Sequence, residues 1–264
     1  MKRTSPSACL LLSMFIAAPA ALAAEFRAYP FVHYFDYTEY ADDGTFLDGE
    51  TGPLLGFGMS LASTSGPHGL RGKFELAGGT VDYDGQTQTG VPHKTDTDTL
   101  LFRLGLDYEF AVLPERVKLI GGADYVAWDR DIQPAYNPLV GGMVGGLLEE
   151  YRWWELRMGI DAVLYARNRH QWSARAEALY IEDPEMTVVD FGDLKLDLGS
   201  ETGFRLTGRY LHQSPDDWSV GAEVYWEEWE FGRSDDVVYG PFIVHEPRSE
   251  TRHRGIRLIV EQRF

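Results

Sequence analysis

The last ten residues of the chain, GIRLIVEQRF from Gly255 to Phe264, carry the pattern that decides the fold. Alternate positions form an apolar set, made of Ile256, Leu258, Val260, Gln262 and Phe264. The positions between them form a charged or small set, made of Gly255, Arg257, Ile259, Glu261 and Arg263. A period of two residues with one apolar face is typical of a β-strand whose two faces meet different surroundings.

The same alternation recurs upstream, at 70–78, 102–110, 154–164 and 218–226. None of these windows fits the 3.6-residue period of a helix. No window after the first 24 residues approaches the ~18 consecutive apolar residues of a transmembrane helix. The chain is therefore predicted to be all-β.

Turn-forming stretches divide the chain at 64–68, 113–115, 168–171 and 214–217. Each of the five longer segments between them is expected to fold back once. The midpoints fall on or beside glycine, at Gly44, Gly90, Gly141-Gly142, Gly192 and Gly240-Pro241. Glycine adopts the positive φ that hairpin tips need. Five hairpins predict ten strands, and twelve is the alternative if 186–190 and 194–198 form an extra pair.

The first 23 residues have the pattern of a cleavable export signal. A positive Lys2-Arg3 pair precedes an apolar run over 10–21, and cleavage is predicted after Ala23. The expected organisation is a signal peptide at 1–23 and a barrel domain at 24–264. Because the one cysteine is Cys9, the mature chain would have no thiol for disulfides, metals or nucleophilic catalysis.

Together with this signal, the final strand resembles the C-terminal signature of outer-membrane β-barrel proteins, which the barrel assembly machinery recognises. The matching positions are Ile256, Leu258, Val260 and Phe264, whereas Gln262 departs from the usual apolar choice. The resemblance implies an antiparallel up-and-down transmembrane barrel in the cell outer membrane of a Gram-negative-type cell, surrounded by outer-membrane lipid and lipopolysaccharide. An even strand number places both termini in the periplasm. Strands longer than the ~9–11 residues that cross a bilayer predict tall extracellular hairpins.

The charges predict a filled lumen. Neighbouring strands place Arg205 and Arg209 opposite Glu223 and Glu227, which in turn face Arg257. Buried charge is tolerated when it is paired, so an ion-pair network is expected, with ten lumen positions of each sign. The cationic ones are Arg71, Lys73, Arg103, Lys118, Arg157, Arg175, Arg205, Arg209, Arg257 and Arg263, and the acidic ones are Glu75, Asp107, Glu109, Asp124, Glu155, Asp161, Glu177, Glu223, Glu227 and Glu261.

Loss of the signal would change the formal net charge from -17 to -19. This acidity disfavours nucleic-acid binding. If the lumen is neutral, the excess acid belongs to external hairpins, at Asp42, Asp43, Asp48, Glu50, Asp82, Asp84, Asp96, Asp98, Glu182, Asp183, Glu185, Asp190, Asp193, Asp235 and Asp236. No pattern in the sequence predicts an oligomeric state.

The second hairpin offers a candidate metal site. A register centred on Gly90 pairs Asp82 with Asp98 and Asp84 with Asp96, all on the outward face. Opposed like charges are destabilising, and Ca²⁺ or Mg²⁺ with oxygen ligands would relieve them, bridging to lipopolysaccharide phosphates. The alternative is a solvated acidic hairpin whose register differs slightly.

Enzymatic patterns are incomplete. Asp82-Tyr83-Asp84 resembles half of the catalytic arrangement of the omptin proteases, but the fourth hairpin, 180–201, has no histidine for the other half. Histidine–serine neighbours suited to lipid hydrolysis occur at the turns, as His170 with Ser173 and His212 with Ser214. The tryptophans are expected to form girdles at the bilayer interfaces, at Trp153, Trp154, Trp172, Trp218, Trp226 and Trp229.

These observations favour a non-enzymatic outer-membrane barrel whose acidic hairpins serve surface interaction or envelope integrity, with no resident cofactor. A narrow porin-like channel for small solutes and an outer-membrane hydrolase are the alternatives.

Overall fold

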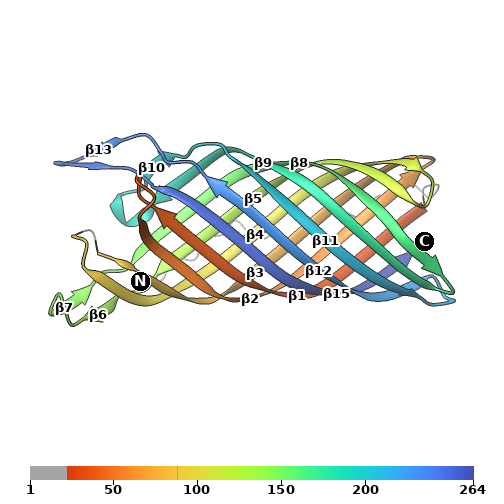
Figure 1. Cartoon of the computed structure of the whole chain (residues 1–264), viewed down its shortest axis with the longest axis horizontal. Helices are drawn as coiled ribbons and strands as arrows, with labels where there is room; N and C mark the ends of the chain where they lie inside the picture. Colours follow the sequence, from red (N-terminus) through yellow and green to blue (C-terminus); the bar gives the residue numbers. More distant parts are fainter. Residues whose placement is uncertain (1–22, 88) are drawn as a thin grey trace.

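A computed structural model describes residues 23–87 and 89–264. These residues form a closed antiparallel barrel of ten long, tilted strands (Figure 1), which confirms the predicted fold class. The wall strands are β1 (Ala23–Tyr40), β2 (Phe46–Ser65), β3 (His68–Gln86), β4 (Pro92–Leu113), β5 (Val117–Ile132), β8 (Leu147–Arg167), β9 (His170–Val188), β11 (Thr202–Gln213), β12 (Trp218–Phe231) and β15 (Arg248–Arg263).

Pairing between the first and last strands closes the wall. β1 pairs with β15 from Glu25↔Arg263 to Tyr40↔Arg248, and Phe264 N donates to Ala24 O at 2.8 Å. Closure removes the unpaired strand edges that could not be tolerated inside a lipid bilayer. The short turns and the described ends of the chain share one end of the barrel, called here the terminal end. The opposite end is the hairpin end.

Smaller elements lie at the hairpin end (Figure 1). Beyond the barrel wall project two hairpins, β6–β7 and β13–β14, while β10 extends the fourth hairpin. Their bounds are β6 (Ala135–Asn137), β7 (Gly142–Val144), the 3-10 helix η1 (Val189–Phe191), β10 (Leu194–Asp197), β13 (Val237–Tyr239) and β14 (Phe242–Val244). In the described part of the chain, no helix has the length and apolarity to cross a membrane.

The predicted glycine tips are confirmed. Positive φ occurs at Gly44, Gly90, Gly141, Gly192 and Gly240. Registers centred on the predicted midpoints were wrong by one to four residues. A centre at Gly90, for example, would pair Leu70 with Phe110, whereas Leu70 pairs with Tyr108. The first tip shows the reason, since Ala41 N donates to Thr45 O and Gly44 N to Ala41 O, both at 2.8 Å. The glycine is therefore the last residue of a three-residue loop, and the hairpin axis passes before it.

The twelve-strand alternative was wrong. β10 pairs with β9 as Leu194↔Val188, and β11 pairs with the same strand as Thr202↔Tyr180. Both pairings follow one register, so β10 and β11 together form the returning arm of the fourth hairpin. Of the predicted signal peptide, residues 1–22 lie outside the described residues.

Apolar side chains cover the outside of the wall in a belt. Its exposed members include Val32, Leu55, Leu106, Met158, Leu206, Val224 and Leu258. On the hairpin side the outward positions become charged, at Asp98, Arg152 and Glu228 among others, and Arg152 pairs with Asp129 at 2.8 Å. This change from apolar to charged marks the edge of the belt. The part of the wall that the belt covers is the part predicted to span a membrane, and it is called here the membrane-spanning part.

The tryptophan girdle needs a correction. Trp154, Trp172, Trp218 and Trp226 are exposed on the belt, whereas Trp153 and Trp229 are buried inside the barrel. Alternation explains the difference, because neighbouring strand residues point to opposite faces.

Candidate functional site

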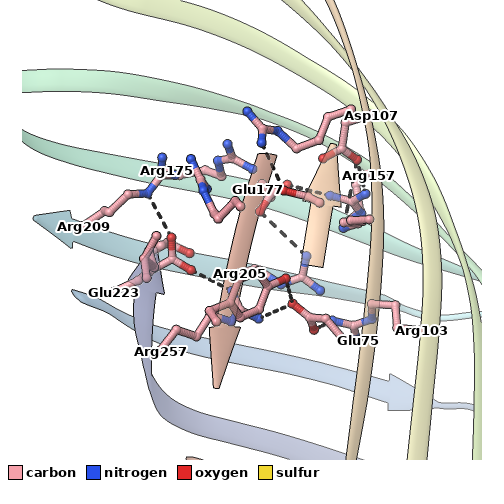
Figure 2. A pocket seen from close by; sticks show the side chains of 17 residues that line it. Glu75, Arg103, Asp107, Arg157, Arg175, Glu177, Arg205, Arg209, Glu223 and Arg257 are labelled. Carbon is pink, nitrogen blue, oxygen red and sulfur yellow. Dashed lines mark hydrogen bonds and ion pairs between the residues drawn. The ribbon is translucent and has the colours of Figure 1, made fainter. Parts of the chain in front are cut away.

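The inward residues of the membrane-spanning part form a charge network, called here the lumen network (Figure 2). In the described part of the chain, eleven cationic and eleven acidic side chains join it, since Arg27 and Glu25 add to the ten predicted positions of each sign. Each charge on the wall thus has its counterpart within the same layer.

Arg157 on β8 is a hub of this network. Its guanidinium pairs with Asp124 at 2.8 Å, with Glu177 at 2.9 Å and with Asp107. The Arg157 side chain has no exposed surface, so solvent cannot replace these partners. Planar guanidinium groups suit such multiple pairing, because their five N–H donors have a fixed geometry.

The five residues predicted as the lumen network lie together. Arg205 stands opposite Glu227 and pairs with it at 2.5 Å, and Arg209 stands opposite Glu223 at 3.0 Å. Arg257 reaches Glu223 at 2.7 Å. Arg257 does not face Glu227, as had been predicted, because the residue across from Glu227 on β15 is His253.

A cavity of about 60 Å³ lies within the network, lined among others by Arg175, Arg209 and Glu223 (Figure 2). Such a volume holds a few water molecules. Water molecules there can hydrate the charged groups, but the cavity is far smaller than a solute-conducting pore.

Above the network, on the hairpin side, lies a layer of buried rings. The rings of His33 and His253 stack at a centroid distance of 4.1 Å, and His33 Nδ1 is 2.8 Å from the Tyr225 hydroxyl. Farther along follow large aromatic side chains with at most 1% exposure: Phe35, Tyr37, Trp128, Tyr151, Trp153 and Phe231. We call this set the aromatic layer. The aromatic layer was not predicted from the sequence. Strand alternation could have indicated it, because it places Trp128 and Trp153 on the inward face.

Beyond the aromatic layer, carboxylates outnumber cations. Arg130 on β5 pairs with Glu39 at 3.0 Å, Asp48 at 3.2 Å, Glu50 at 2.7 Å and Glu149 at 2.7 Å. A fifth carboxylate is Glu246. The Tyr151 hydroxyl lies 2.9 Å from Glu246 Oε1 and 3.1 Å from Glu149 Oε2, and its one proton can be donated to either of them. We call Arg130 and these five carboxylates the acidic cage. The expectation that Asp48 and Glu50 belong to an exposed hairpin was wrong, since both point inward.

The imbalance shifts protonation in the acidic cage. Burial, and next the charge of Asp48, raise the pKa of Glu39 to about 8. Burial likewise raises the pKa of Asp48, Glu50 and Glu149. The pKa of Glu246 lies well above its usual range through burial and the nearby Glu39 and Glu149 charges. Desolvation disfavours charged carboxylates that one guanidinium cannot neutralise, so the cage binds protons at neutral pH.

The predicted metal site has the wrong register. Asp82 lies opposite Asp96, but Asp98 faces Thr80 and Asp84 faces Lys94. Lys94 Nζ pairs with Asp84 at 2.5 Å, and Thr80 donates to Asp98 at 2.6 Å. The side chains are exposed and outward, as expected. Within residues 23–87 and 89–264, no group of three or more acidic, histidine or cysteine side chains is arranged to hold a metal ion.

The partial enzymatic patterns also remain apart. The outward Asp82 and Asp84 do not line the lumen. His170 and His212 lie at the terminal end with their rings 4.9 Å apart, and His170 Nδ1 is 2.7 Å from the Tyr210 hydroxyl. His245 approaches Asp236 at 3.4 Å. His253 instead packs inside the ring layer.

Comparison with known proteins identifies the fold. No protein-family model and no curated protein sequence matches the chain. The crystal structure of the outer membrane protease OmpT from Escherichia coli is similar with a TM-score of 0.62 at 8% identity, over 92% of this chain and 96% of that one. The translocator domain of the autotransporter NalP from Neisseria meningitidis has a TM-score of 0.48 at 10% identity, over 90% and 88%. The toluene transporter TodX from Pseudomonas putida has a TM-score of 0.36 at 12% identity, over 93% and 90%. The similarity to OmpT, together with the closed ten-strand barrel, shows that the chain has the fold of the outer-membrane β-barrels.

Proposed function

We propose that this protein is a non-conducting outer-membrane barrel that holds extracellular hairpins in place for surface interaction. The terminal end would face the periplasm and the hairpin end the exterior, as an even strand number requires. Outer-membrane lipid and lipopolysaccharide would surround the belt, after export through a cleaved signal peptide and insertion by the barrel assembly machinery.

One observation carries this proposal: the lumen is filled at two successive levels. The lumen network occupies the membrane-spanning part, and the aromatic layer follows toward the hairpin end. A permeating solute would have to break buried ion pairs and then displace aromatic side chains with at most 1% exposure. Either step is costly, because unpaired buried charges and disrupted packing both destabilise the wall.

Single-channel recording in planar bilayers tests the proposal. We expect no conductance steps above the background of protein-free membranes, with insertion checked separately by the heat-dependent gel mobility of the folded barrel. Liposome swelling with small sugars should likewise match empty vesicles. Steady conductance steps from inserted, folded protein would instead support a narrow channel for small solutes and overturn the closed lumen.

A further inference from the structure

Two segments at the hairpin end are uncharged and mainly apolar, whereas the second tip, 85–92, is uncharged but polar. Residues 132–148, which include the β6–β7 hairpin, contain no Asp, Glu, Lys or Arg, and the same holds for 237–244, which form β13–β14. In the whole chain 25% of residues are charged. The first and fourth tips differ, since they carry Asp42-Asp43 and Asp190 with Asp193.

Both uncharged hairpins expose large apolar side chains. On β6–β7, Tyr136 and Met143 form a cross-strand pair, and Leu139 at the tip is 71% exposed. On β13–β14, Val238 and Ile243 form a cross-strand pair with 77% and 68% exposure. Contiguous exposed apolar residues on a protein surface mark an interaction site. We call these two sets the apolar tips.

The apolar tips are held in defined positions. Val237 and Val244 at the base of β13–β14 pack against the buried core, and Tyr239 stacks on Phe191 at 5.4 Å. In β6–β7, Asn137 is the last residue of β6 before the tip; its Nδ2 donates to Pro92 O at 2.8 Å, and its Oδ1 accepts from Leu139 N at 2.9 Å. One face of each hairpin is thus anchored while the other is presented outward.

The placement and charge of the surroundings select the partner. Figure 1 shows β6–β7 and β13 on opposite sides of the hairpin end, both projecting away from the barrel. A surface that meets both at once must be broad. The rim around them is acidic, with exposed Asp42, Asp43, Asp84, Asp98, Asp235 and Asp236 among others. This charge opposes a second copy of the chain or an anionic membrane, which would bring like charges together.

We propose that the two apolar tips dock on a zwitterionic lipid bilayer that faces the hairpin end. This inference rests on the proposed function, since it names the partner of the displayed surface. Leucine, isoleucine and phenylalanine side chains gain free energy on entering the acyl boundary. Tyr136 and Tyr239 supply the amphipathic rings that favour the headgroup level. An uncharged tip also leaves no charge to be desolvated when it enters the bilayer.

The test uses full-length barrel in nanodiscs and vesicles of phosphatidylcholine. The one cysteine of the chain is Cys9 in the predicted signal peptide, so Leu139→Cys or Ile243→Cys can carry an environment-sensitive fluorophore. We expect a blue shift and brighter emission on adding these vesicles, and little change with a fluorophore at Thr89→Cys, on the polar second tip. Vesicles of phosphatidylglycerol should bind several-fold more weakly because of the acidic rim.

A matched pair of variants separates apolar docking from general charge effects. The double variant Leu139→Asp/Ile243→Asp should lower vesicle binding by about tenfold or more. Thr45→Asp/Thr89→Asp adds the same two charges at other exposed tips and should bind nearly as the wild type does.

Equal binding by the two double variants, or no binding to phosphatidylcholine by folded wild type, would overturn the proposal. Tip-dependent pairing of nanodiscs without vesicle binding would also overturn it and identify a second copy as the partner. These outcomes leave the closed lumen untouched. Only steady conductance steps in the planar-bilayer recordings would refute the non-conducting barrel.

Discussion

The lumen network and the acidic cage lie inside one barrel and are built from the same residue types, arginine, aspartate and glutamate. They differ in whether their charges balance. In the network, as the structure describes it, eleven cations meet eleven carboxylates. In the cage, Arg130 pairs with four carboxylates, and the Tyr151 hydroxyl links a fifth, Glu246, to Glu149. The charges of the network neutralise one another, so they need no protons. The excess carboxylates of the cage must instead take protons up. The network is therefore a permanent filling, and the cage depends on pH.

The largest expected effect comes from breaking the balance of the network. Arg157→Met leaves Asp107, Asp124 and Glu177 without a shared cation, so the free energy of unfolding should fall by about 3–5 kcal/mol. Urea titration in lipid vesicles, followed by tryptophan fluorescence, measures it. Arg248→Met is the control, because that half-exposed arginine forms surface pairs worth about 0–1 kcal/mol. Equal losses in both variants would mean that the network does not depend on its hub.

A smaller effect is expected from the corresponding change in the cage. Arg130→Met should cost about 2 kcal/mol at pH 8, less than the hub arginine, because its neighbours can take up protons. At pH 5 the same variant should cost less, since carboxyls with raised pKa take up protons more readily there. Unfolding titrations at both pH values check this. A loss that does not change with pH would contradict the distinction between cage and network.

The wild-type protein should itself lose stability as pH rises. Glu39 has a folded pKa of about 8 against an ordinary value of 4.5. Between these values the folded state holds a proton that the unfolded state has released, so the free energy of unfolding falls with increasing pH. Above pH 6.5, the ordinary pKa of histidine, no buried histidine offsets this loss, so we expect a decrease of at least about 1.4 kcal/mol from pH 6.5 to pH 8, the equivalent of one pKa unit. Glu39→Gln should flatten this slope, and an unchanged slope would place the titrating group elsewhere.

The smallest effect concerns the exposed acidic hairpin, where charge is neither buried nor balanced. Added calcium should leave the melting temperature of the refolded barrel unchanged, because Asp84 and Asp98 face Lys94 and Thr80 rather than one another. A saturable rise that Asp82→Asn abolishes would reinstate the metal site. Magnesium at the same concentration serves as the comparison.

Prediction from sequence succeeded where the signal is local. The five glycine tips and four turns depend on backbone conformations of single residues, and the apolar belt depends on a two-residue period. Register was less accessible, because whether Gly44 is central or last in its loop is decided by the hydrogen bonds of Ala41 and Thr45.

The candidate site shows the same division. The pairs Arg205–Glu227 and Arg209–Glu223 follow from parity on adjacent strands. The acidic cage escaped prediction because Glu39 and Glu50 reach Arg130 from strands that are distant in sequence, and only Glu149 lies directly across from it in the same hairpin. Position near a tip suggested that Asp48 and Glu50 were exposed, although strand alternation continues beyond the membrane and turns them inward.

By itself, the sequence determined that the chain forms ten amphipathic strands joined by glycine tips, because side-chain alternation and positive φ are properties of a few neighbouring residues. Only the tertiary structure decided how the lumen is layered. The height of each inward side chain depends on the registers of all ten strands together, and closure of β1 on β15 makes those registers consistent. That closure places charge balance in the membrane-spanning part and an excess of carboxylates around Arg130 beneath the apolar tips.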